Sequence, residues 1–341
     1  MKQLLNTLYI NTQGTYLRLE HDTLKLDAEG KTVHQMPLHH LGSIVMFGNV
    51  LVSPYLLHRC AEDGRALVWM TRSGRFRGRL HKPVSGNVLL RRAQFEVLSS
   101  VEGTLELSKR MVAGKLQNAR QTLLRGARES KNEEHKSALQ SVAQTHANTI
   151  KRLPRLKYLD EVRGAEGDAA KLYFGVFDHL ILNADFSFNG RNRRPPKDPV
   201  NALLSFTYSL LGNECAAACE GVGLDPQMGF LHALRPGRDS LGLDLMEELR
   251  SVFADRFVLS LINRQQLKPK DFNERPGGAV ELKEDARKDF LIAYQKRKQD
   301  EVTHPVLGKP VPYGLIPHIQ ARLLARHLRG DLPEYQPFFQ R

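Results

Sequence analysis

The sequence predicts an α+β protein in which an N-terminal β-sandwich-like domain (residues 1–92) is followed by a larger all-α domain (residues 93–341). Two observations support this division. Apolar residues alternate with polar ones through roughly the first 90 residues, whereas from about Phe95 they recur every three or four positions. A chain of 341 residues is also long enough for two domains.

The first domain is predicted to consist of short strands separated by turns. Gly14, Gly30 and Gly48 each stand where a tight turn needs positive φ, so we expect mainly antiparallel strands in a sandwich or curled sheet. A short helix at 54–60 begins with proline, which is favoured in the first helical turn. The expected strands are Leu8–Ile10, Thr15–Glu20, Thr23–Leu26, Ser43–Phe47, Asn49–Val52 and Ala66–Met70.

The second domain is predicted to be almost wholly helical. Leu105, Val112, Leu116 and Leu123 belong to one apolar stripe with basic residues on the other faces. Three polar or proline-rich stretches interrupt the pattern, at 125–136, 189–199 and 268–278. We expect the first to be a helix–helix connection or loop, and the second to be a rigid loop because three prolines prevent a helix.

Charge and composition restrict the class of partner. The chain has 50 Lys and Arg against 37 Asp and Glu, a net charge of +13, which favours a polyanion such as nucleic acid. Three cysteines are too few for a disulfide framework and indicate a reducing compartment, so we expect a cytoplasmic protein. No stretch has the roughly 18 apolar residues of a membrane span, and no dinucleotide, nucleotide-triphosphate or serine-hydrolase motif is present.

One histidine and several acids form a candidate metal site. His232 follows a turn sequence, Asp244 and Glu247 lie three positions apart on one face of a predicted helix, and Glu166 stands near a predicted helix start. An imidazole with carboxylates suits Mg²⁺ or Mn²⁺ and phosphoryl transfer. The alternative is that His232 is a loop residue and that the acids compensate a helix dipole.

Several arginines are candidates for phosphate contact. Arg193 and Arg194 lie on the proline-bearing loop, and Arg235, Arg238 and Arg250 flank the candidate metal site in sequence. Further candidates are Arg75 and Arg77, for which a charged, solvated edge strand is an equally good interpretation.

Taken together, five ordered segments resemble the CRISPR adaptation integrase family, also described as the CRISPR-associated endonucleases that capture new spacers in antiviral defence. The sequence as a whole is similar to the branch of this family that accompanies CRISPR systems of type I, subtype C. The segments are LGSIVMFGNVLVSPYLLHRCAEDGRALVWM, EGDAAKLYF, NRRPPKDPVNALLSFTYSLL, GLDPQMGFLHALRPGRDSLGLDLMEELR and FNERPGGAVEL, the last followed by AYQKRKQ.

The resemblance implies roles for individual residues and for the domains. Glu166, His232 and Glu247 match the family's metal ligands, and Asp244 matches a supporting acidic position. Arg235 and Arg250 match basic positions near the site. The helical domain is then the catalytic one, and the β-domains make a homodimer.

The resemblance also implies a reaction and further partners. A 3′-hydroxyl of captured double-stranded DNA attacks a phosphodiester at the edge of a CRISPR repeat, without ATP, with Mg²⁺ or Mn²⁺ as cofactor. A small second adaptation protein completes a heterohexamer. Two alternatives remain open: a metal-dependent nuclease that hydrolyses branched DNA or RNA, and a non-enzymatic nucleic-acid scaffold.

Overall fold

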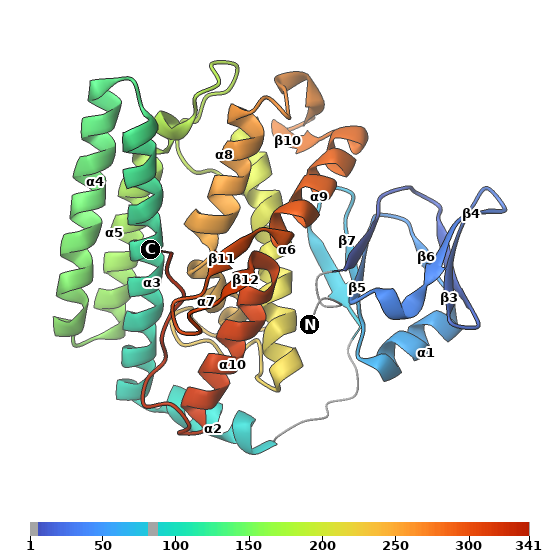
Figure 1. Cartoon of the computed structure of the whole chain (residues 1–341), viewed down its shortest axis with the longest axis horizontal. Coiled ribbons are helices and arrows are strands. Elements are labelled where there is room, and N and C mark those ends of the chain that lie inside the picture. Colours follow the sequence, from blue (N-terminus) through green and yellow to red (C-terminus); the bar gives the residue numbers. More distant parts are fainter. Residues whose placement is uncertain (1–5, 81–87, 341) are drawn as a thin grey trace. The chain divides into compact units, whose positions relative to one another are not determined.

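The computed structural model describes residues 6–80 and 88–340. The chain divides into two compact units (Figure 1), one made of Met1–Gly86 with Lys283–Gln299 and the other of Asn87–Leu282 with Asp300–Arg341. In the described part of the chain no helix is both long and apolar enough to cross a membrane.

Two four-stranded sheets form the first unit. One has the order β1 (Thr7–Ile10), β5 (Ser43–Phe47), β7 (Ala66–Met70), β8 (Phe76–Arg79). The other has the order β4 (Lys31–Pro37), β3 (Thr23–Ala28), β2 (Tyr16–Glu20), β6 (Leu51–Val52). Their alternating apolar side chains are buried together, which confirms the predicted sandwich-like architecture.

Strand direction differs from the expected antiparallel pattern. β5 pairs parallel with both β1 and β7, and β2 pairs parallel with β6. The reason is the order of the connections: the strands β2–β4 of the other sheet intervene between β1 and β5, and helix α1 (Pro54–Asp63) lies between β6 and β7. The Ser53 hydroxyl caps α1 and Gly64, at φ 65°, ends it.

Helix α9 (Glu284–Gln299) groups with the first unit, although the sequence assigned residues 93–341 to the helical domain. Asn11 Nδ2 donates to the Glu284 carbonyl at 3.1 Å, and the Arg287 guanidinium lies 5.8 Å from the Phe47 ring centroid. A single boundary at 92/93 therefore leaves out the segment Lys283–Gln299, in which the chain rejoins the first unit.

The second unit is largely helical, which confirms the predicted fold class. Its helices are α2 (Val88–Ser99), α3 (Val101–Glu129), α4 (Glu133–Arg152), α5 (Leu159–Gly175), α6 (Pro199–Val222), α7 (Ser240–Glu247), the π-helix η5 (Arg250–Asp255), α8 (Arg256–Asn263) and α10 (Ile316–Leu328). Short 3-10 turns are Leu153–Arg155, Phe177–Leu180, Pro269–Asp271 and Tyr313–Leu315.

Two details of this unit correct the sequence predictions. It contains two antiparallel hairpins, β9 (Phe272–Arg275) with β10 (Ala279–Leu282) and β11 (Glu301–Thr303) with β12 (Pro310–Pro312), because Gly277, Gly278 and Gly308 supply the positive φ that such turns need. The polar stretch 125–136 does contain the predicted helix–helix connection, but only at 130–132, since α3 continues to Glu129 and Asn132 caps α4.

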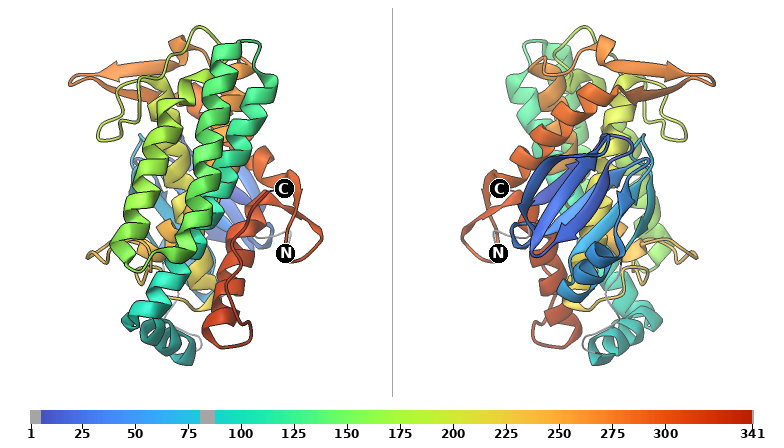
Figure 2. Two further views of the ribbon diagram at one scale, coloured as in Figure 1. Left: turned by 90° about the vertical axis from the view of Figure 1, so that its left-hand side faces the viewer. Right: turned by 90° about the vertical axis from the view of Figure 1, so that its right-hand side faces the viewer.

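Helices α3, α4 and α5 lie side by side (Figures 1 and 2). A core cluster joins α3 to α5 and to the loop between α6 and α7, through buried residues that include Leu116, Ala165 and Leu231. Each of these is the sequence neighbour of a polar residue discussed below: Lys115, Glu166 and His232. The apolar core therefore determines where those polar side chains emerge.

Candidate active site

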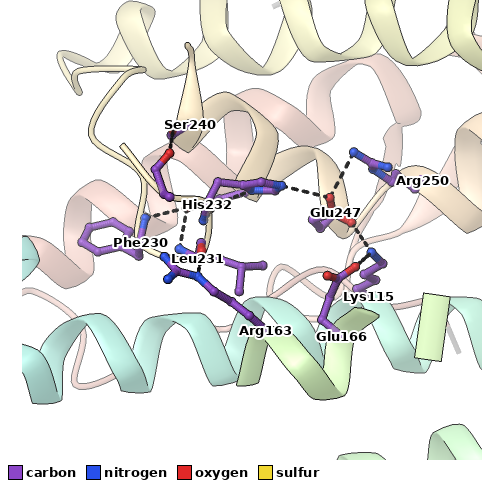
Figure 3. Close-up of polar contacts among 11 residues, drawn as sticks. Lys115, Arg163, Glu166, Phe230, Leu231, His232, Ser240, Glu247 and Arg250 are labelled. Carbon is purple, nitrogen blue, oxygen red and sulfur yellow. Dashed lines mark hydrogen bonds and ion pairs between the residues drawn. The ribbon is translucent and has the colours of Figure 1, made fainter. Parts of the chain in front are cut away.

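A cavity of about 1140 Å³ lies within the second unit, lined by residues of α3, α5, α6, α7 and η5. Its charged lining includes Lys115, Glu166, His232, Glu247 and Arg250 (Figure 3). Its aromatic lining consists of Tyr173, Phe174, Phe188 and Tyr208.

Glu166 lies on α5, well inside the helix rather than near its start as the sequence suggested, because α5 begins at Leu159. Three positions earlier on the same helix, Arg163 Nε donates to the Leu231 carbonyl at 2.8 Å. Arg163 therefore ties the helix that carries Glu166 to the loop that carries His232. The sequence analysis did not identify Arg163.

His232 lies on the loop between α6 and α7, held by the buried carboxylate of Asp244. Asp244 Oδ2 accepts from the backbone N–H of Phe230 at 2.6 Å and of Leu231 at 3.0 Å. Oδ1 accepts from His232 N at 3.0 Å and lies 2.6 Å from His232 Nδ1. Since the carboxylate accepts throughout, Nδ1 is the ring donor, and in the neutral form of this ring Nε2 carries the lone pair.

Gly229 allows this loop to approach α7 closely. A Cβ on Gly229 would lie 2.6 Å from the carbonyl carbon of Ser240, the first residue of α7. The Ser240 hydroxyl in turn donates to the Ala233 carbonyl at 3.2 Å. The loop is thus fixed to the helix on both sides of His232.

Glu247 ends α7 with its side chain 3% exposed. Its Oε1 is 3.7 Å from His232 Nε2 and 3.1 Å from an Arg250 guanidinium nitrogen. Burial alone would raise the pKa of Glu247, but Arg250, Lys115 and His232 together lower it below its ordinary value, so the carboxylate stays charged.

The next residue, Glu248, points into a different environment, as its position on the helix predicts. It accepts from Tyr335 OH at 2.5 Å, from Phe338 N at 2.7 Å and from Gln320 Nε2 at 2.8 Å. Burial raises the pKa of this carboxyl to about 8. Glu248 therefore fastens the C-terminal segment beneath α7 and takes no part in the cavity.

Lys115 on α3 is a site residue that the sequence analysis missed. Its Nζ forms ion pairs with Glu166 Oε1 and, at 2.7 Å, with Glu247 Oε2 (Figure 3). Lys115 is one of many basic residues on the helices, and no local motif marks it. Only the packing of α3 against α5 and α7 brings it to the two acids.

The residues present fit a divalent cation, although the described residues contain no preformed group of three His, Cys, Asp or Glu side chains. Glu247 Oε2 is buried and makes no hydrogen bond of acceptable geometry. Two carboxylates and one imidazole lone pair are the donor set that hard or borderline ions prefer. A cation already lies between the two carboxylates in the form of the Lys115 ammonium.

Arg250 is anchored by aromatic packing beside the acids. Its guanidinium lies 4.8 Å from the Tyr208 ring centroid, and that of Arg191 lies 5.4 Å from the same ring. The Tyr208 hydroxyl and, at 2.9 Å, the Tyr173 hydroxyl donate to the buried carboxylate of Asp255. Burial raises the pKa of Tyr208 well above its ordinary value, so this phenol is a poor nucleophile.

The predicted phosphate-binding arginines separate into three groups. Arg193, Arg238 and Arg250 line the cavity. Arg194 and Arg235 are exposed residues of the neighbouring loops and are not part of the lining. The remaining two, Arg75 and Arg77, are exposed at the turn before β8 and on β8 in the first unit.

Comparison with known proteins gives a family over nearly the whole chain. The family model described as CRISPR associated protein Cas1 matches residues 8–296. A CRISPR-associated endonuclease Cas1 of Moorella thermoacetica is 54% identical over 343 residues, covering 100% of both chains. Another, of Rhodospirillum rubrum, is 49% identical over 345 residues and covers 99% of both.

Solved structures give the same fold. A Cas1 protein from Thermotoga maritima has a TM-score of 0.82 at 23% identity, with 95% of this chain and 97% of that chain covered. A casposase bound to integration product also has a TM-score of 0.82, at 21% identity, with coverage of 97% and 92%. A chain of a Cas6-RT-Cas1–Cas2 complex matches 98% of this chain over 36% of its own length, with a TM-score of 0.82 and 22% identity. By its family match and by relatives of this identity, the chain belongs to the Cas1 family, whose curated members are named CRISPR-associated endonucleases.

Proposed function

We propose that this Cas1-family chain is a metal-dependent DNA endonuclease and integrase of spacer acquisition. It joins the 3′-hydroxyl of captured DNA to a phosphodiester at the edge of a CRISPR repeat. The observation that carries the proposal is that Glu166, His232 and Glu247, from three separate segments, all line a cavity whose other charged residues are basic except for Asp255. The names of the relatives and the casposase neighbour support it.

Glu166, Glu247 and His232 Nε2 would hold Mg²⁺ or Mn²⁺. When bound, such an ion supplies charge neutralisation at the attacked phosphate and lowers the pKa of an attacking hydroxyl. Glu247 Oε2 supports this assignment, because this buried charged oxygen makes no hydrogen bond and already lies 2.7 Å from a positive charge, the Lys115 ammonium.

The chain's own residues position the reactants. Asp244 holds the His232 ring with Nε2 facing Glu247, and the Tyr208 ring keeps the Arg250 guanidinium in place. Arg193 and Arg238, on two loops that border the cavity, hold the phosphodiester backbone by charge-assisted hydrogen bonds. No covalent protein intermediate is needed, because the DNA supplies the nucleophile and one phosphodiester bond forms for each bond broken.

Hydrolysis of branched DNA or RNA is the second candidate function, favoured by the name endonuclease among the relatives. It uses the same residues, with water attacking in place of a 3′-hydroxyl. A scaffold that only binds nucleic acid is the third, and it predicts no dependence on Glu166.

The partners follow from the same proposal. Double-stranded DNA is the substrate, two copies of the chain form a homodimer through their β-domains, and a small second adaptation protein completes a heterohexamer. The neighbour in a Cas6-RT-Cas1–Cas2 complex supports a partner of the Cas2 kind.

A branched duplex that imitates a half-integrated spacer, labelled on the strand to be resealed, tests the reaction. The full chain is incubated with Mn²⁺ or Mg²⁺, with EDTA, and with and without Cas2. A longer labelled strand that disappears with EDTA and in Glu166→Ala is the expected result. The matched control is Asp168→Ala, because Asp168 is an exposed acid two positions along the same helix that does not line the cavity.

Other products distinguish the alternatives. Shorter metal-dependent fragments without a resealed strand indicate hydrolysis. Retained DNA binding without any reaction, in both the presence and absence of Cas2, contradicts both enzymatic proposals and leaves the scaffold.

A further inference from the structure

The Lys115 ammonium lies between two carboxylates that come from two other helices (Figure 3). The Lys115 side chain is 12% exposed, that of Glu166 26% and that of Glu247 3%. Two acids this close and this buried repel each other unless a positive charge lies between them. Lys115 supplies that charge.

Lys115 is held by these carboxylates alone. Among the described residues, its Nζ has no partner other than Glu166 and Glu247, and its contact with Glu247 Oε2 lacks hydrogen-bond geometry. Arg250, the other cation on Glu247, is different because its guanidinium also packs over Tyr208. A lysine on a flexible stem is therefore the group that is free to move, while the arginine stays.

We propose that Lys115 is a displaceable counter-ion: it occupies the place between Glu166 and Glu247 and must leave when a divalent cation binds there. This inference rests on the proposed function. The charges of Lys115 and Arg250 balance those of the two carboxylates, so an added divalent ion would leave an excess of two positive charges if Lys115 stayed. Lys115 lines the cavity, which gives the ammonium room to withdraw.

The physical consequence is that Lys115 opposes metal binding while it preserves the site. Without metal, its positive charge offsets the repulsion between the two carboxylates and holds them close together. With metal, its displacement costs free energy, so the observed affinity is weaker than the carboxylates and imidazole alone would give.

Calorimetric titration of the full chain with Mn²⁺, in the absence of DNA, tests this directly. In Lys115→Met the stem is kept and the charge is lost, and the Mn²⁺ Kd is expected to fall at least tenfold relative to the wild type. Lys109→Met is the matched control, because Lys109 lies on the same helix and pairs at 2.8 Å with Glu106, outside the cavity lining. Its Kd is expected to match that of the wild type.

A second measurement needs no variant at Lys115, so it also decides the matter if Lys115→Met does not fold. The wild-type chain is treated with an amine-acylating reagent with and without Mn²⁺, and the modified lysines are identified by mass spectrometry. Labelling of Lys115 is expected to rise when Mn²⁺ is present, while labelling of Lys109 stays constant.

The results that would overturn the proposal are of two distinguishable kinds. An equal or weaker Mn²⁺ affinity in Lys115→Met, or labelling of Lys115 that does not rise with Mn²⁺, overturns the counter-ion role alone. Absence of Mn²⁺ binding in both the wild type and Lys115→Met, or Mn²⁺ binding that Glu166→Gln leaves unchanged, overturns the metal assignment of the proposed function together with this inference.

Discussion

Replacing Asp244 by Asn should unfold the candidate site, because the carboxylate accepts four donors and an amide has only one acceptor atom. Each Asp244 oxygen accepts two of these donors: Phe230 N and Leu231 N on one, His232 N and His232 Nδ1 on the other. Two donors lose their acceptor if the NH₂ group faces Phe230 and Leu231, and one does if it faces His232, because the neutral imidazole can carry its proton on Nε2 instead. At about 1.5–3 kcal/mol for each bond to a charged group, the expected loss of unfolding free energy is about 1.5–6 kcal/mol.

The assay is denaturant unfolding followed by far-ultraviolet circular dichroism, which reports mainly on the helical unit, together with titration of Mn²⁺. We expect Mn²⁺ affinity to fall about 10–100-fold as well, since the His232 ring loses the partner that orients it. The control is Asp160→Asn, because Asp160 is 92% exposed and its pair with Arg163 at 3.1 Å should contribute less than about 1 kcal/mol.

An Asp244→Asn protein that unfolds within about 1 kcal/mol of the wild type would refute this reasoning about unsatisfied donors. Normal stability combined with normal Mn²⁺ affinity would also refute the orienting role of Asp244.

Three further changes have defined expectations. Burial raises the pKa of Glu248 to about 8 from its ordinary 4.5. Between these two pH values the folded state keeps a proton that the unfolded state has released, so the free energy of unfolding falls as pH rises from 4.5 to about 8. The free energy of unfolding of the wild type should therefore be lower at pH 8 than at pH 6, with this group contributing at most about 1.4 kcal/mol per pH unit. Glu248→Gln should lack this contribution. Gly229→Ala should cost about 1–3 kcal/mol of unfolding free energy, because the new Cβ would lie 2.6 Å from the Ser240 carbonyl carbon. In DNA-binding titrations, Arg193→Ala and Arg194→Ala should each reduce the slope of log K against log salt concentration by about 0.9 if each removes one phosphate contact.

The predictions for Glu248, Gly229 and the two arginines each have a control or a result that would contradict them. The control for Gly229→Ala is Gly164→Ala, in helix α5, where nothing lies within 4 Å of the new Cβ. This change should raise the free energy of unfolding by about 0.5–1 kcal/mol. The packing argument fails if both glycine variants behave alike. An identical pH dependence in Glu248→Gln contradicts the raised pKa, and an unchanged salt slope removes Arg193 or Arg194 from the phosphate contacts.

The architecture could be predicted because its causes are local. Alternation along the strands of the first unit and three-to-four spacing along α3 are properties of neighbouring residues, and both are borne out. Strand direction was predicted wrongly because pairing partners are distant in sequence: β1 meets β5 only after three strands of the other sheet have intervened. The helix–helix connection predicted at 125–136 is shorter than expected, because the polar side chains before it face solvent on a helix whose Ala127 is buried.

The sequence by itself determined the fold class, the family segments and the residue types at Glu166, His232, Asp244 and Glu247. Spacing of three along one helix placed Asp244 and Glu247 on a shared face, and the family segments assigned Glu166 and His232 to the same site. Only the tertiary structure decided which cation lies between the two acids, since Lys115 and Glu166 are 51 residues apart and meet through the packing of α3 on α5. Local patterns specify faces of helices, whereas the positions of charges on facing helices depend on how their apolar residues pack together.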